Sequence, residues 1–513
     1  MKYILTAAQH KASDTFTSET IGIPSLVLME RAAAAMLSAM IHMACDLRKV
    51  QVICGTGNNA GDGAVLARML AEKGYSVKVF LAGSRERFSE QMKQQIRILE
   101  SGYYPNIQMI DGYSERKLPD FSDTTLIVDA IFGIGLKRPV EGYLREVIRS
   151  VNQAAHCSVW ACDMPSGIDT DTGAVLGTAV KADATVTFTA GKPGLYLYPG
   201  ASYAGEVLVK QIGIPLTEDV KEQAEYRVLE ESDLYTLPAR AQEGNKGTFG
   251  KILVAAGSRE IFGAAYLAAK AALRSGAGMV KVFTHEINRA PLAALFPEAL
   301  LSLYTDLAGK GDRLQIEKKL AADISWADCI LVGPGLGTSD ESAYVLDTIV
   351  RLAEKAGKPL VLDADALNML SLDPKGIRRF TVPTVFTPHV VEMARLTGKS
   401  VTELKADPGR AAAELAEQTG ACIVLKDART VIAEPNGKKW INVSGCSALA
   451  TAGSGDVLAG ITAACMCLYR ETEIPPAVLA CRVHGRAGEF AAEQRSEASV
   501  IAGDLLDQIK FFV

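Results

Sequence analysis

Short apolar runs alternate with helical patterns along both halves of the chain. In the first half, helical patterns such as 64–74 and 142–153 separate runs that are almost continuously apolar. Strands of this kind are typical of a parallel sheet covered by helices on both faces. The runs that predict strands here are 51–55, 75–82, 125–132, 158–165 and 184–190, and the half ends near 205–215. The pattern therefore predicts an α/β fold for this half, with residues 1–45 as a helical preface.

The same alternation starts again in the second half. A helical pattern at 341–357 lies among the strands, and a glycine turn at 452–469 leads into the last strong helical pattern. The runs that predict strands are 251–258, 327–337, 359–367, 383–389 and 422–427. Pro215 and the polar stretch after it indicate a boundary. We therefore expect two α/β domains, at residues 1–218 and 225–513, without a sequence repeat that relates them.

Composition narrows the class of partner. Of the 513 residues, 22% are charged and 48% are hydrophobic, as in ordinary globular proteins, and the net charge is −5. The chain has no basic field, so we expect no nucleic-acid partner. The ten cysteines show no metal-binding or paired spacing, which predicts reduced thiols and a cytoplasmic protein.

The most apolar stretch of membrane-spanning length is 26–45. It contains Glu30, Arg31 and His42, and therefore predicts a packed helix and no membrane partner. The N-terminal residues carry too short an apolar stretch for a signal peptide. The many Ala-rich helical patterns permit subunit interfaces, and we expect a homo-oligomer whose interface the sequence does not specify.

The first candidate site follows the strand at 51–55. In the segment GTGNNAGDGAVLARML, residues 55–70, four glycines let the backbone approach a ligand closely, and the helix that follows directs free N–H groups outward. Such a cradle at the carboxyl end of a parallel strand is where open α/β sheets bind ligands. Taken singly, Asn58, Asn59 and Asp62 are equally consistent with turn and cap positions.

Three further strand ends carry polar side chains. Asp129 precedes a glycine loop, Asp163 and Ser166 lie after the next strand, and Lys192 follows the strand at 184–190. Carboxyl ends of parallel strands meet at one edge of a sheet, so these groups should converge on the glycine–asparagine loop. Oxygen donors such as those of Asn59, Asp129 and Ser166 suit a hard cation.

The motifs LMERAAAAM, GTGNNAGDG, DAIFGIGL and DMPSGIDTDTG resemble, in order, those of the NAD(P)H-hydrate epimerase domain across about residues 1–215. The resemblance implies a Rossmann-like three-layer sandwich that interconverts the R and S hydrates at C6 of the reduced nicotinamide ring. It also implies a potassium ion held by Asn59, Asp129 and Ser166. The implied hydrate-binding residues are Asn58, Asn59, Ala60, Gly61, Asp62, Gly133, Ile134, Gly135, Leu136, Lys137, Arg138, Pro139 and Asp163.

Within this resemblance, Asp163 is the candidate proton-transfer residue and Lys192 a candidate helper. The acid–base group of the family is not fixed by the sequence, so other assignments stay open. Ala60 stands where the family usually has glycine, and it should be tolerated unless the backbone needs a positive φ.

The strongest chemical motif of the second half is AGSGD, residues 452–456. Gly453 and Gly455 free the backbone, the helix from Val457 supplies a positive dipole end, and Asp456 lies at its mouth. Such a site stabilises charge on a transferred phosphoryl group, while the carboxylate takes a proton from the attacking hydroxyl. The alternative is a structural helix with Asp456 as its N-cap.

The motifs KGTFGKILVAAGS, GPGLGT, LDADALN, TPHVVEMARL and ATAGSGDVLAG resemble the NAD(P)H-hydrate dehydratase domain of the ribokinase-like superfamily over about residues 225–513. In this family a nucleotide phosphorylates the S-hydrate, and phosphate is then eliminated. The resemblance implies Asp456 as general base and magnesium with the nucleotide. The implied hydrate contacts are Ala265, Gly337, His389 and Asp456; the implied nucleotide contacts are Lys426, Asp427, Ala428, Arg429, Thr430 and Gly455. Asp427 stands where the family usually has glycine.

Together the two resemblances predict a bifunctional isomerase and lyase that repairs hydrated NADH and NADPH. The fused order resembles bacterial members and implies ADP, giving AMP and phosphate, although the sequence leaves ADP and ATP open. A ribokinase-type small-molecule kinase with a fused ligand-binding domain is the first alternative. A nucleotide sensor without turnover is the second. The sequence does not show the preference between the two hydrates or any exchange between the sites.

Overall fold

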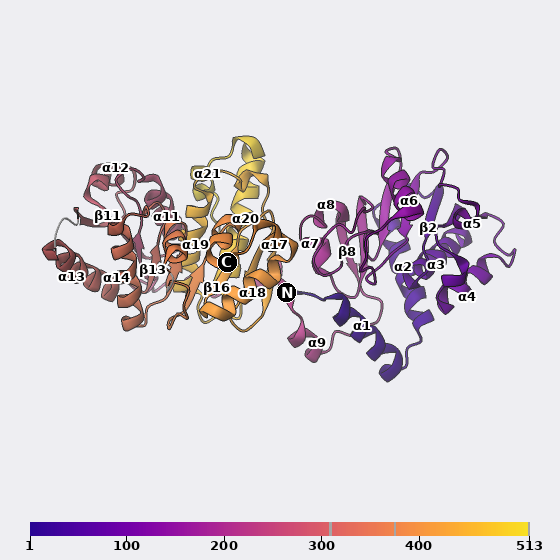
Figure 1. The fold of residues 1–513 in the computed structure, drawn as a ribbon, viewed down its shortest axis with the longest axis horizontal. Coiled ribbons are helices and arrows are strands. Elements are labelled where there is room, and N and C mark those ends of the chain that lie inside the picture. Colours follow the sequence, from indigo (N-terminus) through magenta and orange to yellow (C-terminus); the bar gives the residue numbers. More distant parts are fainter. Residues whose placement is uncertain (307–309, 374–375, 511–513) are drawn as a thin grey trace. The chain divides into compact units, whose positions relative to one another are not determined.

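The computed structural model describes residues 1–306, 310–373 and 376–510 of the chain. Contacts divide the chain into two compact units, Lys2–Tyr226 and Arg227–Val513, with Met1 joining the second (Figure 1). Both units have the predicted α/β architecture. The division falls just after the polar stretch that indicated a boundary, while 1–218 and 225–513 remain the predicted family domains.

The first unit is built on one parallel sheet with the strand order β4-β3-β2-β5-β6-β7-β8. The strands of this unit are β1 (Lys2–Ile4), which is outside this sheet, β2 (Lys49–Cys54), β3 (Ser76–Leu81), β4 (Ile107–Ile110), β5 (Leu126–Ala130), β6 (Ser158–Cys162), β7 (Ala184–Phe188) and β8 (Glu206–Lys210). Its helices are α1 (Ala7–Thr15), η1 (Phe16–Ile21), α2 (Ser25–His42), α3 (Asn58–Glu72), η2 (Arg85–Arg87), α4 (Glu90–Leu99), α5 (Gly112–Glu115), α6 (Gly142–Gln153), α7 (Pro193–Tyr196), α8 (Ala201–Ala204) and α9 (Glu218–Gln223).

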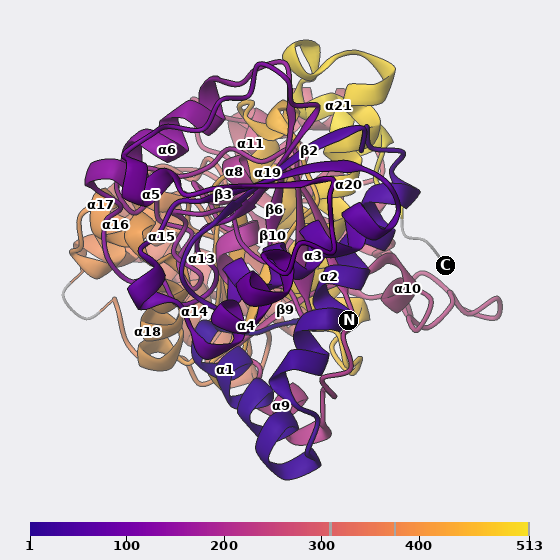
Figure 2. The same ribbon diagram turned by 90° about the vertical axis from the view of Figure 1, so that its right-hand side faces the viewer.

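Both faces of this sheet are apolar because alternate residues of each strand face opposite sides. Val52 and Val128 belong to the core shared with α2, α3 and α4, whereas Ile53 and Ile127 belong to the core shared with α6. Figure 2 shows the strands between α6 on one side and α2 and α3 on the other. The predicted three-layer sandwich is therefore confirmed.

The second unit is built on a larger sheet that includes the order β18-β17-β16-β15-β14-β13-β10-β11-β12. Its strands, with β9 at the division, are β9 (Tyr226–Val228), β10 (Lys251–Ala255), β11 (Met279–His285), β12 (Leu300–Tyr304), β13 (Cys329–Val332), β14 (Leu360–Leu362), β15 (Thr384–Phe386), β16 (Cys422–Leu425), β17 (Thr430–Ala433) and β18 (Lys439–Asn442). Its helices are α10 (Glu231–Leu234), α11 (Gly263–Arg274), η3 (Glu286–Asn288), α12 (Arg289–Leu295), α13 (Lys310–Trp326), α14 (Asp340–Ala356), α15 (Asp365–Leu372), α16 (Val390–Thr397), α17 (Val401–Ala406), α18 (Pro408–Thr419), η4 (Ser447–Leu449), α19 (Ser454–Leu468), α20 (Pro476–Gln494), η5 (Glu497–Ser499) and α21 (Ala502–Asp507).

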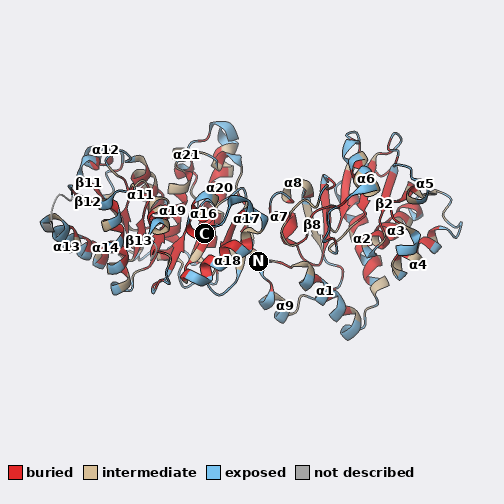
Figure 3. Ribbon diagram, in the orientation of Figure 1, coloured by how far each residue is buried: buried red, intermediate tan, exposed pale blue. Residues whose placement is uncertain are grey.

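This sheet is parallel from β16 to β12 and turns antiparallel at β17 and β18. One face packs on α11, α19, α20 and α21, with Val254 and Leu331 among the strand residues of that core. The alternate residues Leu253 and Ile330 are buried as well, and α13 and α18 pack on the sheet outside that core. Figure 3 shows buried strands between helices whose outer faces are exposed.

The structure differs from the expected elements in detail. Helix α3 begins at Asn58 and not at 64, because Gly57 is extended and the asparagines enter the first turn. Strand β14 ends at Leu362, since the following Asp-Ala-Asp segment turns into α15. The sequence analysis did not name strands β1, β4, β8, β9, β11, β12, β17 and β18, which lie outside the apolar runs chosen as strands.

Helix α2 is the one described helix long and apolar enough to cross a membrane by length and composition, and 44% of it is buried in the structure. Its inward residues, such as Met29, Met36 and Met40, are part of the core of the first unit, as a packed helix requires. The ten cysteines, all within the described residues, are free.

Candidate active sites

The first candidate site lies where β2, β5, β6 and β7 end. The loop after β2 passes so close to the loop after β5 that a Cβ at Gly55 would lie 2.0 Å from the Ile131 carbonyl oxygen. A Cβ at Gly63 would lie 2.5 Å from Cβ of Ala130. Glycine at these positions therefore lets the predicted ligand loop and the end of β5 meet, as the motif indicated.

Asp129 and Ser166 are brought together at this edge, and both are fully buried. Ser166 donates to Asp129 Oδ1 from its hydroxyl at 2.6 Å and to Oδ2 from its backbone N–H at 2.7 Å. Burial raises the pKa of Asp129 to about 6, although the bonds from Ser166 oppose this shift. The pair offers oxygen atoms to a cation, whose charge would favour the ionised carboxylate.

Asn59 completes this oxygen-rich group. Its side-chain amide is buried and has no hydrogen-bond partner among the described residues. A Cβ at Gly133 would lie 3.2 Å from Cβ of Asn59, so the two loops pack together there. A buried amide without a partner is costly, so its position fits a ligand that the structure does not contain. The three predicted potassium ligands thus have the chemistry that such an ion requires.

Asp163 and Lys192 form a buried ion pair with 2.6 Å between Lys192 Nζ and Asp163 Oδ1. Lys192 is 1% exposed and also donates to the Thr187 hydroxyl at 2.6 Å. Burial alone would raise the pKa of Asp163, but the Lys192 ammonium lowers it below its usual value. Asp163 has φ of 67°, a backbone region uncommon for a residue with a side chain. The two predicted proton-transfer groups are therefore in direct contact.

Two ionisable residues near this pair were missed by sequence reasoning. His10 and Asp14 lie one turn apart on α1, which is the only signal that could have grouped them. Burial and the charge of Lys192 lower the pKa of His10 to about 3. Partial burial of its carboxyl and the charge of Asp163 raise the pKa of Asp14 to about 6. Burial, Asp163 and Asp14 raise the pKa of Asp62 well above its usual value, so this site collects several carboxyl groups.

The remaining predicted hydrate-binding residues of this unit differ in how far they are buried. Leu136 is buried in the core beside α6, and Lys137 forms ion pairs with Asp171 at 2.9 Å and Asp169 at 3.5 Å. Ala60 is fully buried in α3 without a positive φ, so alanine is accommodated at this position. The exposed ones are Asn58, Gly135, Arg138 and Pro139; Gly133 and Ile134 are half-buried, and Gly61 is buried.

The second candidate site lies at the start of α19. Gly453, with φ of 87°, is the N-cap, and Asp456 lies in the first turn. No described residue donates a hydrogen bond to the Asp456 carboxylate, so Asp456 does not cap the helix. Burial and the charges of Asp363 and Asp365 raise the pKa of Asp456 to about 7, against an opposing effect of Lys426. A half-buried carboxylate that titrates near neutrality is suited to accept a proton.

Lys426 lies at the end of β16 and points toward this turn. Its Nζ atom is 3.0 Å from Asp363 Oδ1, and a Cβ at Gly455 would lie 3.3 Å from the same Nζ. Burial would lower the pKa of Lys426, but Asp363 and Glu392 raise it above its usual value. A buried ammonium therefore stands beside the backbone of the predicted anion hole. Sequence analysis named Lys426 and Gly455, whereas Asp363 stood in the LDADALN motif without a role.

The other predicted nucleotide contacts form the turn between β16 and β17. Asp427 pairs with Lys405 at 3.1 Å, so part of its charge is compensated. Ala428 donates its backbone N–H to Asp427, and Arg429 donates to the Val443 carbonyl oxygen at 3.0 Å. Thr430 is the first residue of β17. The structure places the segment next to Lys426, while its contact with a nucleotide stays a prediction.

The predicted hydrate contacts of this unit have different surroundings. His389 is the N-cap of α16: its Nδ1 atom accepts from the backbone N–H groups of Val391 and Glu392, and its side chain is 50% exposed. Gly337, with φ of 76°, donates its N–H to Asp365 at 2.8 Å. Ala265 is fully buried in α11. His389 therefore has a structural role as well as an exposed ring edge.

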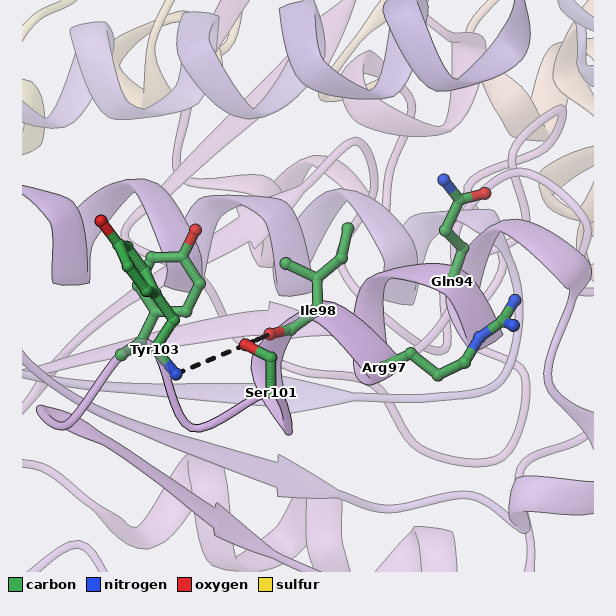
Figure 4. A pocket seen from close by; sticks show the side chains of 6 residues that line it. Gln94, Arg97, Ile98, Ser101 and Tyr103 are labelled. Carbon is green, nitrogen blue, oxygen red and sulfur yellow. Dashed lines mark hydrogen bonds between the residues drawn. The ribbon is translucent and has the colours of Figure 1, made fainter.

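Two surface hollows lie away from these groups. One, of about 540 Å³, is lined by Gln94, Arg97, Ile98, Ser101, Tyr103 and Tyr104 (Figure 4). The other, of about 590 Å³, lies beside α6 and includes Asn152 and Lys181. Neither contains a predicted site residue, so the candidate sites rest on the chemistry at the strand ends.

Comparisons with known proteins cover both units. A family model described as NAD(P)H-hydrate dehydratase matches residues 252–510, and one described as YjeF-related protein N-terminus matches residues 25–194. A solved structure of an ADP/ATP-dependent NAD(P)H-hydrate dehydratase from Bacillus subtilis is 34% identical, covering 55% of this chain and 95% of that chain, with a TM-score of 0.47.

Two curated relatives match almost the whole chain. The bifunctional NAD(P)H-hydrate repair enzyme Nnr of Thermofilum pendens is 38% identical over 97% of this chain and 94% of its own length. The protein of the same name from Moorella thermoacetica is 37% identical over 99% of this chain and 96% of its own length. With both domain models in the expected order, the chain belongs to the family of bifunctional NAD(P)H-hydrate repair enzymes.

Proposed function

We propose that this chain repairs hydrated NADH and NADPH in two steps, one in each unit. The first unit equilibrates the R and S hydrates at C6, and the second dehydrates the S-hydrate at the expense of ADP, giving AMP and phosphate. The observation that carries the proposal is Asp456 at the start of α19, a half-buried carboxylate to which none of the described residues donates a hydrogen bond. The names of the full-length relatives support the pairing of the two activities.

In the second unit Asp456 accepts the proton of the C6 hydroxyl while the hydroxyl oxygen attacks the terminal phosphorus of the nucleotide. The bond from that phosphorus to the leaving nucleotide breaks, while the N–H groups of α19 and the Lys426 ammonium stabilise the developing charge. Phosphate then leaves C6 with the electrons of its C–O bond while the neighbouring carbon gives its proton to solvent, and the electron pair of that C–H bond forms the ring double bond.

Magnesium would accompany the nucleotide and shield its phosphate charge. The carboxyl groups of Asp363, Glu392 and Asp456 lie around the Lys426 ammonium, and their oxygen atoms are compatible with a divalent cation nearby. The sequence and the fold leave ATP open as an alternative donor.

In the first unit the Asp163–Lys192 pair transfers a proton from and to the hydrated nicotinamide ring during epimerisation. Lys192 keeps Asp163 ionised, so the carboxylate is ready to accept a proton from the hydrated ring, and the ammonium can return one. Asn59, Asp129 and Ser166 would hold a potassium ion, which supplies positive charge near the ligand. The buried unpartnered amide of Asn59 supports this assignment.

The proposal extends to the setting of the protein. We place it in the cytoplasm, as a homo-oligomer without a nucleic-acid or membrane partner. The ten free thiols support the cytoplasmic setting, and the net charge of −5 supports the absence of a nucleic-acid partner. Size measurement in solution and fractionation of cells test it.

The decisive experiment follows recovery of the near-ultraviolet absorbance of reduced nicotinamide from a mixture of both hydrates. Purified protein is supplied with magnesium, potassium and ADP, and spontaneous epimerisation is timed in a sample without protein. We expect full recovery with wild type, none with Asp456→Asn, and a halt after the S-hydrate with Asp163→Asn. Absence of any ADP- or ATP-dependent recovery by wild type refutes repair. Accumulation of a phosphorylated product without release of phosphate would instead identify a ribokinase-type kinase.

A further inference from the structure

Asp363, at the end of β14, is a buried carboxylate to which sequence reasoning gave no role. Its side chain is 1% exposed, and its Oδ1 atom accepts from Lys426 at 3.0 Å and from the Thr387 hydroxyl at 2.6 Å. Two donors from two other strand ends thus converge on one oxygen. A lysine side chain is flexible, so its position beside Gly455 depends on what holds its ammonium group.

The backbone around Asp363 is itself held closely. Asp363 donates its N–H to the Val332 carbonyl oxygen at 3.1 Å, and a Cβ at Gly333 would lie 1.9 Å from the Asp363 carbonyl oxygen. The next residue, Ala364, has φ of 50° and ψ of −115°, which is rare for a residue with a Cβ. Such conformations persist where the surroundings impose them, and they cluster at functional sites. The carboxylate therefore stands on a fixed support.

We infer that Asp363 is a positioning residue, which holds the Lys426 ammonium beside Gly455 so that the phosphates of the nucleotide meet a preformed cation. The inference rests on the proposed function, because it assigns Lys426 to the phosphates of ADP. A cation fixed in advance does not have to be ordered when the ligand arrives, and this raises affinity. Asp363 touches neither the substrate nor the reacting atoms in this assignment.

The arrangement also links Asp363 to the general base. Asp456 is faced by Asp363 from β14, Lys426 from β16 and Asp365 from α15, while Glu392 from α16 faces Lys426. Removal of the Asp363 charge takes away one of the causes that raise the pKa of Asp456. The acidic limb of the dehydration rate should therefore move to lower pH in Asp363→Asn, a shift that a purely structural role would not produce.

The test is a double-mutant cycle on the full chain with magnesium, ADP and the S-hydrate. Wild type, Asp363→Asn, Lys426→Met and the double variant are compared by KM for ADP and by kcat. We expect Asp363→Asn to raise KM about tenfold or more in wild type, and less than about threefold in the Lys426→Met background. Equal factors in both backgrounds, or an unchanged KM in wild type, overturn the inference. Where turnover is too slow, calorimetric Kd values for magnesium–ADP replace KM in the same cycle.

Matched variants separate positioning from loss of fold. Asp323 pairs with Lys281 at 2.7 Å in the same unit and is also buried, so Asp323→Asn should leave KM for ADP unchanged. If Asp363→Asn does not fold, Thr387→Val keeps the charge and removes one hydrogen bond, and should raise KM about threefold. An unchanged KM in Thr387→Val then refutes the inference. Wild type without nucleotide-dependent recovery refutes the proposed function itself, whereas active wild type with additive effects refutes only the role of Asp363.

Discussion

Each unit contains a buried lysine–aspartate pair at the carboxyl edge of its sheet, but the two pairs stand in different relations to the proposed chemistry. In the first unit the paired carboxylate, Asp163, is the proposed proton acceptor, and Lys192 lowers its pKa. In the second unit Lys426 pairs with Asp363, while the proposed acceptor, Asp456, has no hydrogen-bond donor in the part of the chain that the structure describes and a pKa raised to about 7. A paired carboxylate remains a weak base that is always ionised, while an unpaired one becomes a stronger base that titrates.

The largest expected effect is the loss of dehydration when the proposed base of the second unit is removed. Asp456→Asn removes the proposed base without disturbing a hydrogen bond, so nucleotide-dependent dehydration should fall by about 100-fold to 10,000-fold. Epimerisation by the first unit should continue at the wild-type rate. Chromatographic separation of the R and S hydrates measures epimerisation, while absorbance measures dehydration. Retained dehydration would contradict the assignment of Asp456.

The next largest effect comes from removing Lys192 from its ion pair with Asp163 in the first unit. Lys192→Met leaves Asp163 buried without its ammonium partner, which should lower the free energy of unfolding of that unit by about 3–5 kcal/mol and abolish epimerisation. Urea unfolding of the full chain measures the stability. Lys192→Met combined with Asp163→Asn removes the uncompensated charge, and the double variant should regain part of the lost stability. No difference between the single and double variants would show that the pair is not electrostatically coupled.

A smaller effect sharpens the contrast through pH. Asp163 has a lowered pKa, so its contribution to stability is present above the usual carboxyl range and is lost as pH falls through the lowered value. Asp456 has a pKa raised from 3.8 to about 7, so its contribution is present below about pH 4 and is lost as pH rises through about 7. Above pH 7, Asp456→Asn should therefore raise the Tm of the second unit by about 2 °C or more, and Asp163→Asn should lower the Tm of the first unit. Calorimetry between pH 4 and 8 decides whether the two signs are opposite.

His389 gives a still smaller effect because its cap can be kept while its exposed ring edge is removed. Asparagine is a good N-cap, so His389→Asn should leave the Tm of the second unit within about 2 °C of wild type. Loss of the Nε2 atom should raise KM for the S-hydrate about threefold to tenfold. A fall in Tm with an unchanged KM would limit His389 to its capping role.

The smallest effect concerns Asp427, where the family usually has glycine. Lys405 compensates part of its charge, so Asp427→Gly should change KM for ADP by less than about threefold. Measurement at low and at high salt provides the control, because a charge effect is screened and a conformational one is not. A tenfold change would show that the Asp427 charge acts directly on the phosphates.

The sequence predicted what local pattern and strand ends determine. Strands such as β2 and β5 are recognisable because both faces are buried. Gly453 and Gly455 indicate a close approach of the backbone to another group at the start of α19. The same reasoning found Asp456, Lys192 and Asp163 individually. It placed Lys192 and Asp163 at one sheet edge but did not predict their ion pair, since nothing local encodes a contact across 29 residues.

The residues missed by sequence reasoning depend on long-range packing. Asp363 resembles any carboxylate after a strand, and its partner Lys426 lies 63 residues away. His10 and Asp14 belong to a short N-terminal helix whose own pattern is weakly amphipathic, and only the fold brings them near Lys192. The roles of all these residues stay predictions until the variants are measured.

Each unit has a hydrophobic core of its own, built from its own strands and helices. The two units can therefore unfold in separate transitions on heating, each with its own melting temperature. An organism under heat stress would then experience two different deficits. Early failure of the first unit would leave the R-hydrate to slow spontaneous conversion, whereas early failure of the second would leave both damaged forms of the cofactor to accumulate.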